Sequence, residues 1–250
     1  MSSASIRTHE NEGILEITID RPERKNALTA DMYAALAQAL TDAATAESIR
    51  VVLMTGAGGN YSTGNDLQDF LQSPPCGEQD PVFRFLRVMA TFPKPIVCAV
   101  EGFAVGVGMT MLFHADLVYA APTAKFQLPF VNLGLVPEAG SSYLLPLQVG
   151  HVRAAELCLL GDAIDAEKAR DFGLVNAIVP IEELLGLARK KAAQIASKPP
   201  VAIQQTKALL KQVHQKPMLE QMKSEETLFL KLLRTPETID FLKSFFTRKK

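Results

Sequence analysis

The 250-residue sequence contains no tryptophan, only three cysteines, and a formal net charge of −1. Cys76, Cys98 and Cys158 are odd in number and form no Cys-x-x-Cys pair, which argues against a disulfide framework. The near-neutral charge provides no basic stripe, so we expect no nucleic-acid partner. The four histidines lack the spacing of zinc ligands, and we therefore expect no metal site.

Long apolar stretches are also missing. No run approaches the ~20 apolar residues that a membrane-spanning helix needs, so we expect no membrane partner. The N-terminus, Met1-Ser-Ser-Ala-Ser-Ile-Arg7, lacks the apolar core of a signal peptide. The C-terminus, Thr247-Arg-Lys-Lys250, is not the Ser-Lys-Leu signal of peroxisomal proteins. We therefore expect a cytoplasmic protein.

The first two thirds of the chain alternate between two kinds of segment. One kind is short and apolar, as expected of half-buried or buried strands, and comprises residues 14–20, 51–55, 96–100 and 117–121. The other kind is helical in pattern and comprises residues 30–44, which Thr29 can cap, and residues near 82–91 and 105–114. This alternation predicts an α/β fold, with a loop over residues 72–81.

The remainder of the chain is predicted to be helical. Gly161 and Gly173 can end two of the helices as left-handed C-caps. Pro199 and Pro200 interrupt the pattern, which predicts a core over residues 1–198 and a helical region over residues 199–250. The expected helices of this half cover residues 151–160, 165–172, 181–197, 201–213, 217–234 and 236–246.

Three common catalytic motifs are absent. The glycines of Gly56-Ala-Gly-Gly59 are not followed by the Gly-Lys-Ser/Thr of a phosphate-binding loop. The segment 102–108 lacks the glycine spacing of a dinucleotide-binding turn. Ser62 lacks the preceding glycine of a serine-hydrolase nucleophile elbow.

Three other segments carry small residues at expected turns: Tyr61-Ser-Thr-Gly-Asn-Asp-Leu67, Gly102-Phe-Ala-Val-Gly-Val-Gly-Met109, and Gly134-Leu-Val-Pro-Glu-Ala-Gly-Ser-Ser142. In this order they resemble the site-forming segments of the crotonase (enoyl-CoA hydratase/isomerase) family. Further similarities lie at Arg21-Pro22, at Pro93-Lys-Pro95 and over residues 115–120 and 166–175. The resemblance covers nearly the whole chain, so it is far more specific than any single segment.

The resemblance implies a spiral core of ββα units that binds acyl-CoA thioesters. It also implies C-terminal helices that build a homotrimer or a dimer of trimers, and no cofactor beyond the coenzyme A of the substrate. By position, the two backbone N–H groups that hold the thioester oxygen should be those of Thr63 and Val107. An enolate formed at the thioester collects charge on that oxygen, and preorganised donors stabilise it by about 3 kcal/mol each.

The reaction depends on the carboxylates. Family hydratases use two glutamates, and their positions correspond here to Thr110 and Phe130, neither of which is a general base. Glu138 lies in a segment, Pro137 to Tyr143, that resembles the peroxisomal-type Δ3,Δ2-enoyl-CoA isomerases. Moving a double bond from C3 to C2 needs only one base, so we predict an isomerase in which Glu138 carries the proton. A carboxylate that only interacts with a helix N-terminus is the structural alternative for Glu138.

The remaining expectations concern substrate contacts. Phe70, Phe103 and Phe130 are candidates for the acyl pocket, although core packing explains them equally well. Lys25, Lys243 and Arg248 are candidates for the coenzyme A phosphates, although solvated charges are more common. Other residues expected to line the site are Ala27, Ser62, Gly64, Asn65, Asp66, Leu67 and Gly106. Two alternative functions stay open: another crotonase-type acyl-CoA reaction, such as hydration or hydrolysis, and acyl-CoA binding without catalysis.

Overall fold

The computed structural model describes residues 5–247, and Arg248 lies outside them. Nine strands form two sheets over these residues. The six-stranded sheet has the order β1 (Ile6–Asn11), β2 (Ile14–Ile19), β3 (Val51–Gly56), β4 (Ile96–Val100), β6 (Leu117–Ala120) and β9 (Ala177–Ile178). The three-stranded sheet has the order β5 (Phe103–Val105), β7 (Lys125–Gln127) and β8 (Ile164–Asp165).

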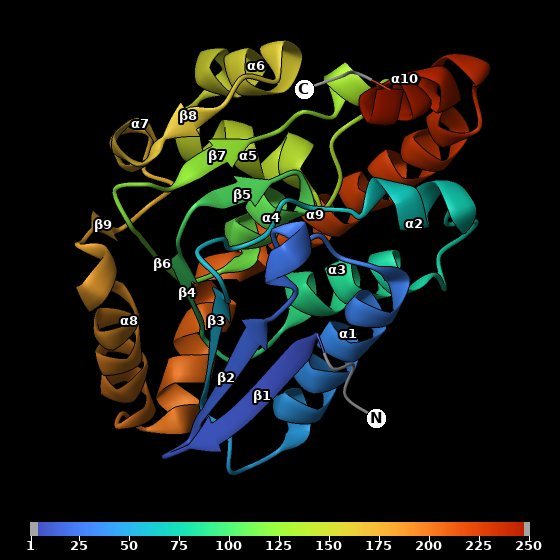
Figure 1. The fold of residues 1–250 in the computed structure, drawn as a ribbon. Coiled ribbons are helices and arrows are strands. Elements are labelled where there is room, and N and C mark those ends of the chain that lie inside the picture. The colour runs from blue at the N-terminus through green and yellow to red at the C-terminus, as the bar shows by residue number, and fades with distance from the viewer. Residues whose placement is uncertain (1–4, 248–250) are drawn as a thin grey trace.

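Helices surround these sheets on several sides (Figure 1). They are α1 (Ala30–Thr45), α2 (Leu67–Gln72), α3 (Pro81–Thr91), α4 (Val107–Thr110), α5 (Ser141–Val149), α6 (His151–Leu160), α7 (Ala166–Asp171), α8 (Ile181–Ala196), α9 (Pro200–Leu233) and α10 (Pro236–Thr247). Short 3₁₀ turns occupy Pro22–Arg24, Met111–His114 and Val131–Leu133. The expected α/β class is confirmed.

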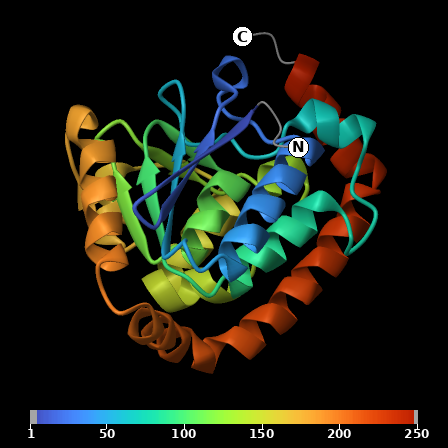
Figure 2. The same ribbon diagram turned by 90° about the horizontal axis from the view of Figure 1, so that it is seen from below.

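The large sheet has an apolar layer on each face, which explains the uninterrupted apolar runs of β3 and β4. Alternate residues of a strand point to opposite faces. Val51 and Leu53 of β3 therefore pack beneath α8, while Val52 and Met54 belong to the main core with α1 and α3. Figure 2 shows α8 on one side of the sheet and α1 and α3 on the other. β2, β3, β4 and β6 run parallel, so their carboxyl ends meet at one edge.

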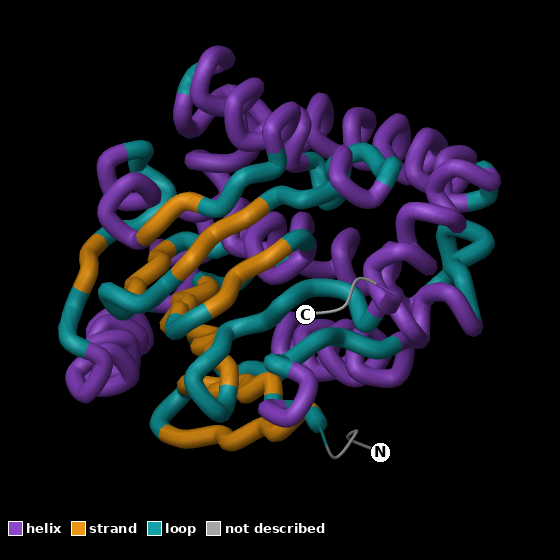
Figure 3. The backbone as a smooth tube through the Cα atoms, turned by 45° about the horizontal axis from the view of Figure 1, so that its top comes forward, coloured by secondary structure: helices purple, strands orange, loops and turns teal. Residues whose placement is uncertain are grey.

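The small sheet extends from that edge. β4 continues through Gly102 into β5, which pairs with β7 in parallel, and β5 leads directly into α4. Figure 3 shows the strands in orange lying next to one another, with helices above them and to their right. Ser62, which follows β3, bridges to Ala104 of β5. The loop after β3 and the loop after β5 are therefore neighbours, and this neighbourhood positions the candidate site.

Two expectations about helices are wrong. The two helices expected over residues 201–213 and 217–234 are one helix, α9, which passes through Pro217. Pro217 removes one backbone hydrogen bond but does not end the helix, and Figure 2 shows α9 curving around the molecule. The helix expected over residues 105–114 is only α4 followed by a 3₁₀ turn.

α9 packs against the core of its own chain. Its start at Pro200 agrees with the expected break at residue 199, and proline suits the first position of a helix. Its second half nevertheless buries Met218, Met222 and Phe229 against α3, α5 and neighbouring loops. The division at residue 198 is therefore not a division of the hydrophobic core. In the described part of the chain, no helix is both long enough and apolar enough to cross a membrane.

Candidate active site

The loop over residues 60–66 is fixed by backbone hydrogen bonds to two other segments. Ser62 bridges to Ala104, and its N–H and C=O pair with Phe103 and Val105. On the other side, the Leu28 N–H donates to the Gly64 oxygen and the Asp66 N–H to the Leu28 oxygen, both at 2.8 Å. Because these bonds use main-chain atoms, the loop keeps its path largely independently of its side chains.

Two glycines bring this loop close to α4. Gly64 has a φ of +84°, and a Cβ there would lie 2.6 Å from the Val105 oxygen and 3.6 Å from the Val107 nitrogen. A Cβ on Gly108 would lie 2.4 Å from the Ser62 oxygen. Contacts under 3.0 Å require the backbone to move, so only glycine allows this approach. The amide of Val107 is thereby held beside the loop.

The geometry of the backbone amides corrects one site assignment. The Thr63 N–H donates to the Lys25 oxygen at 3.2 Å, so the prediction that this group is an unoccupied oxyanion donor is wrong. The Gly64 N–H donates to the Ser62 hydroxyl at 3.1 Å. The N–H groups of Asn65 and Val107, in contrast, have no acceptor among residues 5–247. Val107 begins a helix, where the first N–H groups lack intrahelical partners.

A second, very different segment carries Glu138. Ala139 and Gly140 adopt positive φ values of +62° and +71°, which turn the chain sharply before α5. A left-handed conformation is unfavourable for alanine and persists only where surrounding contacts impose it. His114 supplies one such contact, with its Nε2 atom 2.7 Å from the Ala139 oxygen. Burial lowers the pKa of His114 to about 4, so the ring is neutral and Nε2–H is the donor.

Glu138 is buried, with 4% of its surface exposed. Its Oε1 atom accepts a hydrogen bond of 2.5 Å from the Thr110 hydroxyl, while Oε2 has no hydrogen-bond partner in the described part of the chain. Burial raises the pKa of Glu138 to about 8; the Thr110 hydrogen bond opposes this rise and the charge of Glu225 adds to it. Glu138 can therefore exchange a proton near neutral pH through Oε2.

Thr110 connects this carboxyl to the amide of Val107. The two residues are three positions apart in α4, so about one helical turn separates them. Tyr33 of α1 provides a second connection, because its hydroxyl donates to the Asn65 Oδ1 atom. Burial is the largest cause of the raised pKa of Tyr33, and the charge of Glu138 raises it further. The two free amides and the free carboxyl oxygen thus lie around one small region.

A cavity of about 280 Å³ adjoins Glu138 and Ala139. This volume is close to the lower end of small-molecule pockets, roughly 300 Å³. Its other walls come from the residue 78 loop, α3 and the second half of α9, and comprise Glu78, Phe83, Leu86, Arg87, Leu219, Met222, Lys223 and Glu226. The cavity therefore combines apolar walls with the Glu138 carboxyl group and several charged side chains.

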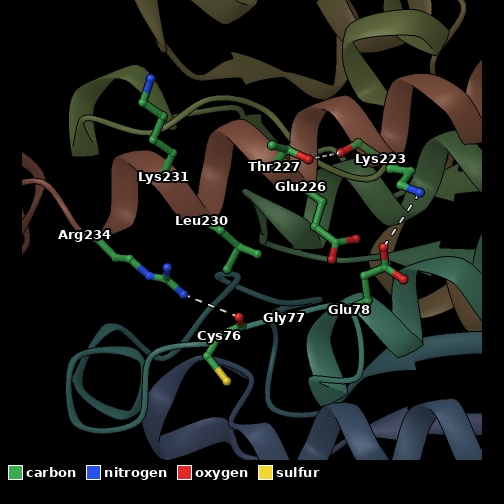
Figure 4. A pocket seen from close by; sticks show the side chains of 9 residues that line it. All are labelled: Cys76, Gly77, Glu78, Lys223, Glu226, Thr227, Leu230, Lys231 and Arg234. Atoms are coloured by element: carbon green, nitrogen blue, oxygen red, sulfur yellow. Dashed lines mark hydrogen bonds and ion pairs between the residues drawn. The ribbon is translucent and has the colours of Figure 1, made fainter.

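An outer pocket of about 470 Å³ lies beside this cavity (Figure 4). The two share Glu78, Lys223 and Glu226 as wall residues. Lys223 and Glu78 lie 4.0 Å apart, and Glu226 pairs with Arg87 at 3.1 Å. Figure 4 also shows Arg234 of the α9 C-terminus reaching the Cys76 oxygen in the loop over residues 73–80. Charged side chains therefore separate the cavity from the outer pocket.

Several expected site residues have structural contacts of their own. Asp66 caps α2 and pairs with Arg21 at 2.7 Å. Burial acts to raise the pKa of Asp66, but the hydrogen bonds from Arg21 and from the amides of Asp69 and Gln68 lower it overall. This carboxylate stabilises the loop. Ser62 is buried and donates to the Asn26 oxygen at 2.8 Å.

The other expected residues near the loop over residues 60–66 are Ala27, Leu67 and Gly106. Ala27 is buried, and its oxygen accepts from Arg21 at 3.0 Å. Leu67 begins α2, and the Gly106 N–H donates to the backbone oxygen of Gln127 at 2.9 Å.

The three aromatic candidates do not line the Glu138 cavity. Phe70 packs edge-on against Phe229 of α9, and Phe130 is buried in the core. Phe103 is 37% exposed, and the Lys25 ammonium lies 4.8 Å from the centre of its ring. The aromatic wall of the cavity is instead Phe83, which carried no motif signal. Contact of Lys25, Lys243 or any of the three aromatics with a substrate stays a prediction.

Comparison with known proteins agrees with this architecture. The sequence model described as "Enoyl-CoA hydratase/isomerase" matches residues 9–250. The 1,2-epoxyphenylacetyl-CoA isomerase of Escherichia coli (strain K12) is 38% identical over 201 residues, covering 78% of this chain and 77% of that protein. Enoyl-CoA delta isomerase 2 of Rattus norvegicus is 36% identical over 254 residues; the match spans 99% of this chain but only 64% of the rat protein.

A solved structure extends the comparison to three dimensions. The structure of Pseudomonas aeruginosa OdaA superposes with a TM-score of 0.96 at 41% sequence identity, over 98% of this chain and 100% of the other. At this similarity, the arrangement of both sheets and the helices around them is a shared fold, and the expected crotonase-type architecture is confirmed.

Proposed function

This chain belongs to the enoyl-CoA hydratase/isomerase family, and from that premise we propose that it is a Δ3,Δ2-enoyl-CoA isomerase with Glu138 as its only proton carrier. The observation that carries the proposal is the state of the Glu138 carboxyl group. It is buried beside a cavity, and its pKa is raised to about 8. One oxygen accepts a hydrogen bond from Thr110, and the other has no hydrogen-bond partner among the residues that the structure describes.

The proposed reaction uses the two halves of the site in sequence. Glu138 Oε2 takes a proton from C2 of a 3-enoyl thioester, and the electron pair of that C–H bond moves toward the thioester carbonyl. The resulting dienolate oxygen accepts hydrogen bonds from the Asn65 and Val107 N–H groups. The protonated Glu138 then returns the proton to C4, and the double bond settles between C2 and C3. The proton taken from C2 is returned at C4, so the reaction neither gains nor loses a proton. Coenzyme A enters as part of the substrate, so the proposed reaction needs no separate cofactor.

Burial suits this cycle. A carboxylate whose pKa lies near the working pH is effective both as a base and, once protonated, as an acid. Because the surrounding residues exclude water from Glu138, the proton it holds is returned to the substrate rather than lost to solvent. With the Asn65 N–H as the first donor instead of the Thr63 N–H, the proposed oxyanion site still has two backbone amides, which is the number that the family resemblance implies.

Hydration is the main competing reaction, since relatives at similar identity include a probable enoyl-CoA hydratase of Rhodobacter capsulatus. Adding water would require a second group to activate the water molecule. Thr110 and Phe130 occupy the two positions where family hydratases were expected to carry glutamates. Thr110 donates its hydroxyl hydrogen to Glu138, so it orients this carboxyl rather than acting as a base.

A paired assay tests the proposal. Purified wild-type protein and Glu138→Ala are each given a 3-enoyl-CoA, to measure isomerisation, and a 2-enoyl-CoA, to measure hydration. We expect wild-type isomerisation that the substitution abolishes, with hydration negligible in both. Fast hydration by the wild type, or isomerisation that survives the substitution, contradicts the proposal. Tight acyl-CoA binding without either reaction identifies a non-catalytic relative.

Assembly and cellular location stay predictions. A homotrimer or a dimer of trimers is consistent with the exposed apolar side chains of α6 and the first half of α9, which are Val152, Leu159, Leu160, Val201, Leu209, Leu210 and Val213. Light scattering after size-exclusion chromatography measures the assembly directly. The predicted cytoplasmic location needs imaging of the tagged full chain, since a relative in Mus musculus is named as peroxisomal.

A further inference from the structure

Glu225 is a buried carboxylate on a helix whose other acidic side chains are more exposed. Only 4% of its surface is exposed, whereas Glu220 on the same helix is exposed to solvent. Its Oε2 atom accepts a hydrogen bond of 2.6 Å from the Gly140 N–H. Its Oε1 atom accepts hydrogen bonds from both the N–H and the hydroxyl of Ser142, at 2.8 and 2.5 Å. All the donors come from a single turn.

That turn is the segment that carries Glu138. The contacted amides lie two and four positions after Glu138, and Ala139, which lies between Glu138 and Gly140, has the unfavourable φ of +62°. An external contact is needed to hold such a turn, and a carboxylate is well suited because these amides lie at the start of α5. Because the Oε2 atom of Glu138 has no hydrogen-bond partner within residues 5–247, the position of this atom depends on its backbone and on the bond from Thr110 to Oε1.

Glu225 also affects the charge of Glu138. Burial is the largest cause of the raised pKa of Glu138, and the negative charge of Glu225 raises it further. The pKa of Glu225 is itself raised by burial, and the hydrogen bonds from Ser142 and Gly140 oppose that rise. The groups that bond to these two carboxyls or act on them electrostatically are Thr110 on α4, Tyr33 on α1, Cys158 on α6 and, through Ser142, Gln221 on α9. Four charged side chains also line the cavity that Glu138 adjoins: Glu78, Arg87, Lys223 and Glu226.

We propose that Glu225 is a positioning residue for proton transfer: from α9, its carboxylate anchors the turn over residues 138–142 and so keeps Glu138 aimed at the cavity. This inference rests on the proposed function of Glu138. It assigns α9 a role within its own subunit, in addition to any part it has in assembly.

The substitution Glu225→Gln tests the anchor while preserving size. A glutamine amide nitrogen cannot accept a hydrogen bond, so at least one of the amides of Gly140 and Ser142 loses its acceptor. Supporting residues of this kind typically change activity by about 10- to 100-fold. We expect kcat for isomerisation to fall within that range, with KM changed by less than about threefold. Glu220→Gln is the matched control, because it removes the same charge from an exposed position of the same helix.

The pH profile separates positioning from general loss of stability. Removing the negative charge of Glu225 lowers the pKa of Glu138, so the acidic limb of kcat/KM should move to lower pH in Glu225→Gln. The limb should stay at its wild-type position in Glu220→Gln. A merely structural role would reduce the amount of active protein without moving the limb.

Hydrogen exchange provides a test that does not depend on activity. In Glu225→Gln, the peptide that contains the Gly140 and Ser142 amides should exchange at least about fivefold faster than in the wild type, because these amides lose a charged acceptor. If Glu225→Gln does not fold, Ser142→Ala removes one hydroxyl contact and should shift exchange and kcat in the same direction by a smaller factor.

The outcomes distinguish this inference from the proposed function. A wild type that does not isomerise 3-enoyl-CoA overturns the proposed function, while faster exchange in Glu225→Gln would still show that the anchor exists. Unchanged exchange, or kcat and an acidic limb equal to those of Glu220→Gln, overturns the positioning role even if Glu138→Ala proves inactive.

Discussion

The loop over residues 60–66 and the turn over residues 134–142 border the same site but are held by different kinds of bond. Main-chain pairing with Leu28 and with residues 103–105 fixes the loop. Side chains from three distant elements, His114, Thr110 and Glu225, fix the turn or the carboxyl it carries. The loop therefore depends mainly on its backbone, with Asp66 as a supporting side chain, whereas the turn depends on particular side chains. Proteins sharing the loop can thus differ in chemistry through the turn.

The largest expected effect comes from the turn, at the carboxyl itself. Glu138→Gln should lower kcat for isomerisation by about 10³- to 10⁴-fold, because the only base is lost. The same variant should be more stable than the wild type at pH 8–9. Folding raises the pKa of Glu138 from about 4.5 to about 8, so its contribution to stability is present below pH 4.5 and lost as pH rises through 8.

Denaturant unfolding at several pH values measures this gain. The stability difference should be small at pH 4.5 and reach roughly 3–5 kcal/mol above pH 8. An equal stability difference at both pH values would mean that Glu138 is not buried as a neutral acid.

The corresponding test of the loop adds a methyl group at Gly108. Gly108→Ala places a Cβ 2.4 Å from the Ser62 oxygen and so pushes α4 away from the loop. The amides of Asn65 and Val107 then separate, and kcat/KM should fall by about 10²- to 10³-fold, as when one oxyanion donor is removed. Gly186→Ala is the control, because a Cβ there meets no atom within 4 Å. If Gly108→Ala is as active as Gly186→Ala, the amides of Asn65 and Val107 take no part in the reaction.

The sequence predicted the elements of the loop half better than its chemistry. The continuous apolar runs of β3 and β4 are typical of strands covered on both faces, and both were found. Which amide is free could not be predicted, because Thr63 and Asn65 differ only in whether an oxygen 38 residues away in sequence, that of Lys25, accepts a hydrogen bond.

The turn half shows the opposite limit. Glu138 could be singled out because the segment from Pro137 to Tyr143 resembles that of the Δ3,Δ2-enoyl-CoA isomerases, but nothing in the sequence distinguished Glu225 from the solvated charges around it. Its burial follows from the path of α9, and Pro217 made that path look like two separate helices. Tertiary packing overrides such a local signal, so a supporting residue of this kind becomes visible only when distant elements are placed together.

A milder change in the turn half removes the hydrogen bond to the catalytic carboxyl. Thr110→Val keeps the shape of the side chain but cannot donate to Glu138 Oε1. Since this bond lowers the pKa of Glu138, its loss should move the acidic limb of kcat/KM to higher pH, opposite to the shift expected for Glu225→Gln. We expect kcat to fall about 10-fold. Thr110→Ser, which retains the hydroxyl, should restore both the rate and the limb; failure to do so would assign the effect to packing.

The smallest expected effect tests whether a side-chain hydrogen bond helps to position the Asn65 amide. Tyr33 donates its hydroxyl hydrogen to the Asn65 side chain, and this is the only side-chain hydrogen bond to Asn65 within residues 5–247. Tyr33→Phe leaves the backbone bonds of Leu28, Gly64 and Asp66 in place. Because these bonds already fix the Asn65 amide, kcat/KM should fall by no more than about fivefold, the value of one hydrogen bond. A loss comparable to that of Gly108→Ala would instead show that the loop, like the turn, is held by side chains, and the contrast between the two halves would have to be abandoned.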